Sequence, residues 1–506
     1  MRFAILLPLA LGPLVQAVLP IHTKGDRFIR PSSPKNEADD NTVFFVEGID
    51  YQPGGSSAYN PDSSSDVLSD SEQCARDAFV FQQLGINTIR VYSLNPDVNH
   101  DECMTILNNA GIYVILDVNT GADGENLNRA DPSGTYNSNY MTHVFKFIDA
   151  FKNYPNVLGF FSGNEVINDD SNYAEIDPQY IRAVQRDMKQ YIAKHSNRSI
   201  PVGYSAADNS NLNLASIKYL ECNSLDGSTI STELDESRSE FFGLNTYQWC
   251  SGSTWDSSGY SVLNSTFSNS SIPLIFSEYG CNAKSPRTFE EVPDGLYGGL
   301  VNTFSGGLVY EYSQEANKYG LVELDSDGSI KYLEDFENLQ SQFRNLTLPN
   351  ITEANVESVS VVKCDSSAIQ DAYSNFGVKN FTLPTQPDSI SSLIRYGVNG
   401  TNTGKILTSY DAPTTFNYTI ENVSGSEISA VLTYADSNTV NELYTSASGS
   451  ATAASSTTTN KASSQSTTSD GSSSSSTSKS KGLANHNIHL STGFCGLVMG
   501  LLSALL

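Results

Sequence analysis

The chain has 506 residues, of which 39% are hydrophobic and 10% aromatic, and its formal net charge at pH 7 is −27. This length exceeds that of one small domain and indicates a large folded unit with additional segments. The negative charge argues against a nucleic-acid partner, because the phosphates would repel the protein, but it is compatible with an uncharged ligand.

The N-terminus has the features of a secretory signal peptide over residues 1–17. Arg2 precedes an apolar run from Phe3 to Leu14, and Ala17 ends a small-residue cleavage site. The apolar run is too short to span a bilayer, so we expect cleavage and not a membrane helix. Sequons of the form N-x-S/T are consistent with this secretory route, and they begin at Asn197, Asn264, Asn269, Asn345, Asn350, Asn380, Asn399, Asn417 and Asn422.

The C-terminus predicts a glycosylphosphatidylinositol (GPI) anchor. Residues 441–482 form a Ser/Thr-rich linker that lacks the apolar side chains needed to fold, and residues 483–506 end in a hydrophobic run with no charge after it. A true C-terminal membrane helix is the alternative, and the missing Lys or Arg after the run favours the anchor. We therefore expect a protein of the cell surface, held at the outer leaflet of the plasma membrane or in the cell wall.

Seven cysteines are present. Cys495 lies in the segment that anchor attachment would remove, which leaves Cys74, Cys103, Cys222, Cys250, Cys281 and Cys364. An even number in an oxidising compartment predicts three disulfides, but spacing alone does not choose among fifteen pairings. No C-x-x-C spacing or cofactor motif occurs, so we expect neither a metal nor a cofactor.

Residues 18–345 contain eight short and almost continuously apolar runs, the pattern of strands that are buried on both faces. Helix-like segments, such as 74–84, 140–152 and 178–195, lie between several of them. This alternation predicts an α/β fold, a (β/α)8 TIM barrel. The expected strands are 43–51, 88–93, 113–119, 157–166, 200–208, 241–247, 274–280 and 306–313.

Residues 346–440 differ from the barrel in their pattern. Segments 414–421 and 427–435 alternate in polarity, which suggests a small β-rich C-terminal domain.

Two glutamates stand where a barrel carries its chemistry. Glu165 ends the fourth expected strand and Glu278 ends the seventh, and active sites of such barrels form at the C-terminal ends of the strands. Two carboxylates that face one pocket are what glycoside cleavage requires. A surface salt bridge is the alternative for either residue alone, but it does not explain why both end apolar strands.

Other strand ends carry side chains that suit a sugar. Aromatic rings stack on the apolar faces of sugar rings, while amides and carboxylates bind the hydroxyl rims. Core packing is the alternative for each tyrosine. The candidate substrate-binding residues are Gln52, Tyr92, Asp117, Asn164, Asp208, Tyr247 and Tyr310.

Over about residues 18–365 the chain resembles the fungal β-1,3-glucanosyltransferases of glycoside hydrolase family 72, and in particular members without a C-terminal cysteine-rich module. No cysteine lies between Cys364 and Cys495. One departure is Ala206–Asn209, where many active members have an Asn-Asp-Asp-like run. The stretches that carry the resemblance are GIDYQPGGSS (48–57), TIRVYSLNP (88–96), VLGFFSGNEV (157–166), FFGLNTYQWC (241–250), LIFSEYGCN (274–282) and GGLVYEYSQE (306–315).

The resemblance implies Glu165 as acid/base and Glu278 as nucleophile in a retaining reaction, for which the carboxyl groups should lie about 5–5.5 Å apart. It also implies the bridges Cys74–Cys103, Cys222–Cys364 and Cys250–Cys281. The expected partners are β-1,3-glucan donor and acceptor chains, cell-wall polysaccharide, and the membrane through the lipid anchor; we expect a monomer and no nucleic acid. A catalytically silent glucan-binding wall protein and an endo-β-1,3-glucanase remain as alternatives.

Overall fold

The computed structural model describes residues 18–32, 41–168, 173–224, 235–357, 359–377, 381–400 and 402–434. The expected signal peptide, Ser/Thr linker and anchor propeptide lie outside the described residues. No helix within the described part of the chain is long and apolar enough to cross a bilayer.

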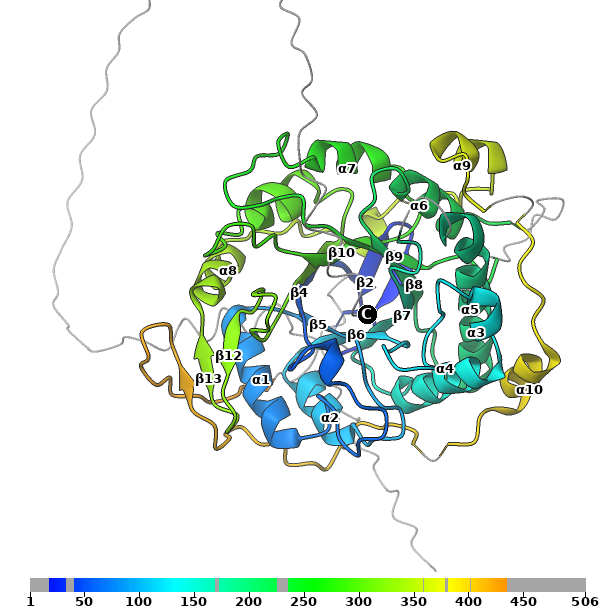
Figure 1. Cartoon of the computed structure of the whole chain (residues 1–506). Coiled ribbons are helices and arrows are strands. Elements are labelled where there is room, and N and C mark those ends of the chain that lie inside the picture. Colours follow the sequence, from blue (N-terminus) through cyan, green and yellow to red (C-terminus); the bar gives the residue numbers. More distant parts are fainter. Residues whose placement is uncertain are drawn as a thin grey trace, which may run out of the picture. The chain divides into compact units, whose positions relative to one another are not determined.

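Eight parallel strands close into a barrel, which confirms the predicted (β/α)8 fold (Figure 1). Each strand pairs with its neighbours in sequence, and the last strand pairs with the first to close the ring. The almost unbroken burial of the strands explains their continuous apolar pattern. They are β4 (Val46–Asp50), β5 (Thr88–Val91), β6 (Tyr113–Asp117), β7 (Val157–Asn164), β8 (Val202–Ala207), β9 (Phe241–Asn245), β10 (Leu274–Tyr279) and β11 (Gly306–Val309).

Helices surround the barrel, and local sequence sets where they begin and end. Asp70 caps the first helix by accepting hydrogen bonds from the backbone of Glu72 and Gln73, and Gly85 ends it with a φ of 88°. The helical segments of the barrel are α1 (Ser71–Leu84), α2 (Asp101–Asn109), α3 (Pro132–Thr135), α4 (Ser138–Phe151), α5 (Tyr173–His195), α6 (Asn213–Glu221), α7 (Tyr260–Phe267), α8 (Glu334–Arg344), η1 (Ser56–Ala58) and η2 (Glu291–Gly299).

A small antiparallel sheet closes the N-terminal end of the barrel. It consists of β1 (His22–Lys24), β2 (Arg27–Arg30) and β3 (Thr42–Phe44), and Phe28 packs edge-on against Phe241 of the barrel interior at 5.8 Å between ring centroids. The expected first strand, 43–51, was therefore too long at its start, because Val43 and Phe44 belong to this second sheet. Because apolar side chains fill the N-terminal end of the barrel, we expect the active site at its C-terminal end.

The segment after the barrel is not β-rich, so this part of the prediction was wrong. Its described residues contain η3 (Glu353–Asn355), α9 (Ser366–Ala372), α10 (Asp388–Tyr396) and a single short strand, β14 (Ile420–Glu421), which extends the β12 (Val322–Leu324) and β13 (Ile330–Tyr332) pair. The polarity alternates because every second side chain of the extended chain is at least half-buried, as Tyr418 is, or fully buried, as Ile420 is. Alternation reports an extended chain with one buried face, whether or not it pairs with strands.

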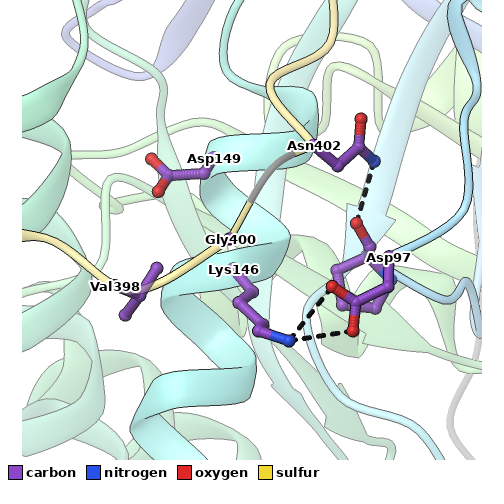
Figure 2. A pocket seen from close by; sticks show the side chains of 7 residues that line it. Asp97, Lys146, Asp149, Val398, Gly400 and Asn402 are labelled. Atoms are coloured by element: carbon purple, nitrogen blue, oxygen red, sulfur yellow. Dashed lines mark hydrogen bonds and ion pairs between the residues drawn. The ribbon is translucent and has the colours of Figure 1, made fainter.

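We call residues 381–434 the strap, because they run along the outside of the barrel helices (yellow to orange in Figure 1). Figure 2 shows where the strap crosses α4 beside the ion pair of Lys146 with Asp97, whose nearest atoms lie 2.8 Å apart. Asn402 donates to the backbone oxygens of Pro96 and Val98, at 2.8 and 2.6 Å. These contacts hold the strap against the outer layer of the barrel.

Replacing Gly404 with alanine should loosen the strap without affecting catalysis. A Cβ at this position would overlap the carbonyl oxygen of Ala150 and the ring of Tyr154, so the strap must shift, at a cost of about 1–3 kcal/mol of stability. The measurements are the melting temperature and the rate of proteolysis within the strap. Gly400→Ala is the control, because its Cβ meets only Lys146 Cγ at 3.8 Å. A rise in KM in Gly404→Ala with an unchanged melting temperature would contradict this purely structural role.

The three disulfides implied by the family resemblance are confirmed. They are Cys74–Cys103, Cys222–Cys364 and Cys250–Cys281. The second attaches the chain beyond the barrel to the end of α6, and the third joins the loops that follow β9 and β10.

Candidate active site

Both candidate glutamates lie at the C-terminal end of the barrel, each next to an irregularity in its strand. In β7, Phe161 pairs with Gly203 but Asn164 pairs with Ser205, so one extra residue is inserted just before Glu165. In β10, Phe276 pairs with Leu244 but Glu278 pairs with Asn245, again with one extra residue. Such bulges re-aim side chains, and here they turn two carboxyl groups toward the same end of the barrel.

Glu278 is 9% exposed, and three side chains bind its carboxyl group. The Tyr92 hydroxyl donates to Oε1 at 2.9 Å and the Tyr247 hydroxyl donates to Oε2 at 2.7 Å. Arg90 Nη1 lies 3.3 Å from Oε1. These partners fix the orientation of the carboxyl group and favour its ionised form.

Burial nevertheless raises the pKa of Glu278 to about 7. Arg90 lowers this pKa, the neighbouring charge of Glu165 raises it, and the hydrogen bonds from Tyr247 and Tyr92 lower it. Arg90 links the two glutamates in one site, because it contacts Glu278 at 3.3 Å and donates to Asn164, the residue before Glu165, at 3.1 Å. A buried carboxyl group with a perturbed pKa is typical of a catalytic site.

Glu165 is half-buried and is held differently. Its Oε1 accepts a hydrogen bond from Asn245 Nδ2 at 2.9 Å, and Asn168 Nδ2 lies 3.4 Å from its Oε2. Neither partner carries a charge. The contrast with Glu278, which faces a guanidinium and two hydroxyls, gives the two carboxyl groups the distinct environments that distinct roles require.

The guanidinium group of Arg90 links several residues of the site through hydrogen bonds. All five N–H groups of its guanidinium have acceptors, two of them directed at Asp117 and the others at Ser277 O, Glu278 and Asn164. Asp50, fully buried and 4.0 Å from Nη1, receives no hydrogen bond from it. Burial raises the pKa of Asp50, so this neighbour of the site favours its neutral form.

The structure places each predicted substrate-binding residue at this end of the barrel, but several are occupied by protein partners. Gln52 exchanges two hydrogen bonds with the backbone of Ser93, and Asp117 is bound to Arg90. Tyr310 packs at 6.5 and 6.3 Å from the rings of Tyr92 and Tyr247. Tyr92, Tyr247 and Tyr310 thus form an aromatic wall around Glu278.

Asp208 differs from the others because it supports a neighbouring loop. Its carboxylate accepts hydrogen bonds from Thr246 Oγ1 at 2.6 Å, from Asn213 Nδ2 at 2.6 Å and from Gln248. Asp208 therefore fixes the loop that carries Tyr247, and the Ala206–Asn209 run contributes to the site through that loop.

The candidate site residues predicted from the sequence do not include Arg90, Asn245, Ser205 or Ser277. The hydroxyls of Ser205 and Ser277 both donate to Asn245 Oδ1, at 3.1 and 2.7 Å, which leaves Asn245 Nδ2 to face Glu165. Arg90 and Asn245 occupy the same strand-end positions as the residues that were selected, which is the signal that could have found them.

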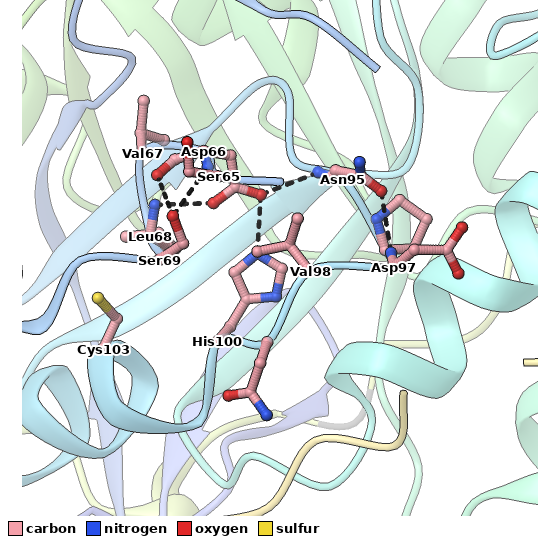
Figure 3. Close-up of polar contacts among 12 residues, drawn as sticks. Ser65, Asp66, Val67, Leu68, Ser69, Asn95, Asp97, Val98, His100 and Cys103 are labelled. Atoms are coloured by element: carbon pink, nitrogen blue, oxygen red, sulfur yellow. Dashed lines mark hydrogen bonds and ion pairs between the residues drawn. The ribbon is translucent and has the colours of Figure 1, made fainter. Parts of the chain in front are cut away.

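The long loop between β4 and α1 borders this end of the barrel and is anchored by Asp66 (Figure 3). The Asp66 carboxylate accepts hydrogen bonds from the backbone of Leu68 and Asn95, both at 3.0 Å, and lies 2.8 Å from His100 Nε2. One buried carboxylate thereby ties the loop after β4 to the loop after β5. The strands and these loops together give a fixed frame for the two glutamates.

We expect Tyr247→Phe to shift the acidic limb of the pH profile to higher pH. The role of nucleophile that the family resemblance implies for Glu278 requires its carboxylate form, so kcat/KM should fall as the pH drops below the pKa of about 7. The Tyr247 hydroxyl lowers that pKa, and its removal therefore raises the pKa. The measurement is kcat/KM from pH 4 to 9, with Tyr113→Phe as a control because its hydroxyl binds Leu19 O at the far end of β6. A limb that stays in place or moves to lower pH would exclude this role of Tyr247.

Known proteins are similar to this chain in sequence and in fold. A family model described as glucanosyltransferase matches residues 11–347, a range that includes all eight barrel strands. The probable 1,3-beta-glucanosyltransferase GAS3 of Saccharomyces cerevisiae is 68% identical over 436 residues, which are 86% of this chain and 83% of that protein. The 1,3-beta-glucanosyltransferase gel2 of Aspergillus fumigatus is 45% identical over 437 residues, covering 85% of this chain and 86% of its own.

Solved structures show the same fold. A glutamate-to-glutamine mutant of Saccharomyces cerevisiae Gas2p, in complex with laminaritetraose and laminaripentaose, is 34% identical with a TM-score of 0.61 and covers 73% of this chain and 75% of its own. A second Gas2p structure, in complex with laminaritriose and laminaritetraose, is 35% identical with a TM-score of 0.62 and covers 73% and 78%.

Proposed function

This chain belongs to the glucanosyltransferase family, glycoside hydrolase family 72, and we propose that it elongates β-1,3-glucan of the fungal cell wall. It cleaves an internal β-1,3 linkage of a donor chain and transfers the new reducing end to the non-reducing end of a second glucan. The observation that carries this proposal is the pair Glu165 and Glu278 at one end of a closed barrel, where Arg90 contacts Glu278 at 3.3 Å and Asn164, next to Glu165, at 3.1 Å.

The reaction proceeds by two displacements at the anomeric carbon. In the first, a Glu278 carboxylate oxygen bonds to this carbon, the glycosidic bond breaks, and Glu165 gives its proton to the leaving oxygen. In the second, Glu165 takes the proton of an acceptor hydroxyl, whose oxygen bonds to the same carbon while the bond to Glu278 breaks. Both steps invert the carbon, so the product keeps the β configuration.

The surrounding residues support these roles. Tyr92 and Tyr247 orient the nucleophile, and Asn245 orients the acid/base through the contact at 2.9 Å. We assign the donor sugar site to residues around the two glutamates at this end of the barrel. Its members are Gln52, Tyr92, Asp117, Asn164, Tyr247 and Tyr310, with Asp208 acting on the acceptor side through the loop of Tyr247.

Transfer requires a sugar hydroxyl to compete with water for the covalent intermediate, and a bound acceptor does so through its high effective concentration. Incubated with reduced laminari-oligosaccharides, the protein should therefore give products longer than the substrate. If all products were shorter than the substrate, the protein would be an endo-β-1,3-glucanase. Glucan binding without any product would identify a silent wall protein.

We further propose that the mature protein is a GPI-anchored monomer at the cell surface, on the basis of residues 1–17 and 483–506. Phosphatidylinositol-specific phospholipase C should release it from membranes of cells that express the full chain. Light scattering of the released protein should give the mass of one glycosylated chain. Retention in the membrane after treatment would instead favour a C-terminal membrane helix.

A further inference from the structure

We propose that Tyr204 of β8 is a positioning residue for the acid/base Glu165, which it serves by holding the turn that follows β7. This inference rests on the function proposed for Glu165. Tyr204 is fully buried on the outer face of the barrel, where its ring packs 6.4 Å from that of Phe242. The next residue, Ser205, instead faces the barrel interior and binds Asn164 and Asn245.

The turn that carries Glu165 needs support, because its backbone is strained. Glu165 has a φ of 49°, a left-handed conformation that costs a residue with a side chain about 1–2 kcal/mol. Strain of this kind persists only where surrounding contacts enforce it. Asn164 is the last residue of β7 that pairs with β8, so strand pairing does not determine the conformation of the turn beyond Glu165.

Two consecutive residues of β8, Tyr204 and Ser205, accept hydrogen bonds from the turn and hold its backbone. The backbone N–H of Glu165 donates to Ser205 O at 2.8 Å, and the backbone N–H of Ile167 donates to the Tyr204 hydroxyl at 2.9 Å. Glu165 thus lies between two fixed points, one at its own nitrogen and one two residues later. Val166 and Ile167 are 6% and 3% exposed, so water does not readily replace the hydroxyl as acceptor.

The Tyr204 ring also limits how the turn can move. A Cβ built on Gly163 would lie 3.1 Å from Val166 Cγ2 and 3.6 Å from Tyr204 Cε2, so the ring and the turn both pack closely against Gly163. Removing only the hydroxyl keeps this packing but leaves the Ile167 N–H buried without an acceptor. The turn should then relax, and the Glu165 carboxyl group should leave its position 2.9 Å from Asn245 Nδ2.

The test is Tyr204→Phe, measured with two donors that differ in their need for an acid. An oligosaccharide leaving group must be protonated by Glu165, whereas dinitrophenolate departs without a proton when Glu278 attacks. With laminari-oligosaccharides, kcat should fall about 10²-fold, the scale of effect of an ångström-sized displacement of a catalytic group, with KM nearly unchanged. With a dinitrophenyl laminaribioside, the initial burst of dinitrophenolate should keep the wild-type rate constant.

Two further variants keep the result interpretable. Tyr113→Phe also removes a hydroxyl from a fully buried tyrosine, one that donates to Leu19 O at 2.7 Å, and should leave both donors unaffected at a comparable melting temperature. Gly163→Ala presses on the same turn from the strand side and should reproduce the dependence on the leaving group.

The outcomes separate this inference from the proposed function. If Glu165→Gln itself shows no dependence on the leaving group, the proposed role of Glu165 fails. If Glu165→Gln shows it but Tyr204→Phe slows both donors equally, or slows neither, the positioning role of Tyr204 is overturned.

Discussion

Glu278→Gln should abolish glucan transfer, lowering kcat/KM by at least about 10⁴-fold, as expected when the nucleophile of a covalent mechanism is removed. An amide cannot attack the anomeric carbon, so no glycosyl-enzyme forms. Product analysis with reduced laminari-oligosaccharides and mass spectrometry of the protein measure the two consequences. With dinitrophenyl laminaribioside, the variant should show neither a burst nor turnover.

The variant should remain folded, which makes the loss interpretable. Burial raises the pKa of Glu278 to about 7, so a neutral amide of the same shape suits this position. Glu291→Gln is the matched control, since Glu291 is 3% exposed in η2, and burial raises its pKa to about 8. Glu278 would not be the nucleophile if Glu278→Gln still transferred glucan, or if Glu291→Gln lost as much activity as Glu278→Gln.

Glu165→Gln should lower transfer between laminari-oligosaccharides by about 10²–10⁴-fold, the usual contribution of general acid–base catalysis. Attack by Glu278 on a donor with a dinitrophenyl leaving group needs no acid, so the burst should survive while the later turnover becomes slow. The glycosyl-enzyme should accumulate, because no base activates the acceptor. Rapid mixing and mass spectrometry of the intermediate measure these effects.

Azide gives a direct check on the same role. It is an anion that attacks the glycosyl-enzyme without losing a proton, so it needs no base. Added azide should restore turnover of the dinitrophenyl donor by Glu165→Gln and yield a β-glycosyl azide. A variant that loses the burst, or that does not respond to azide, would show that Glu165 is not the acid/base.

The apolar barrel strands could be predicted because their burial on both faces leaves a continuous apolar run in the sequence. This apolar run does not show where a strand of one sheet ends and a strand of another sheet begins. Val43 and Phe44 continue the apolar run of β4 but pair with β2, and nothing in their side chains marks that division. The strap shows the same limit, because the alternating pattern around Ile420 reports one buried face and does not reveal whether a strand or a helix covers it.

The sequence by itself determined the barrel and the strand-end positions of the two glutamates, since strand periodicity and position at a strand end are local properties. Tertiary structure decided which groups surround these glutamates. The inserted residues in β7 and β10 appear only when each strand pairs with a neighbouring strand. The hydrogen bonds of Arg90 and the contact of Tyr204 with Ile167 likewise join segments that lie far apart in the chain. Such contacts depend on how eight strands are brought into register around one axis, and no single stretch of sequence encodes that register.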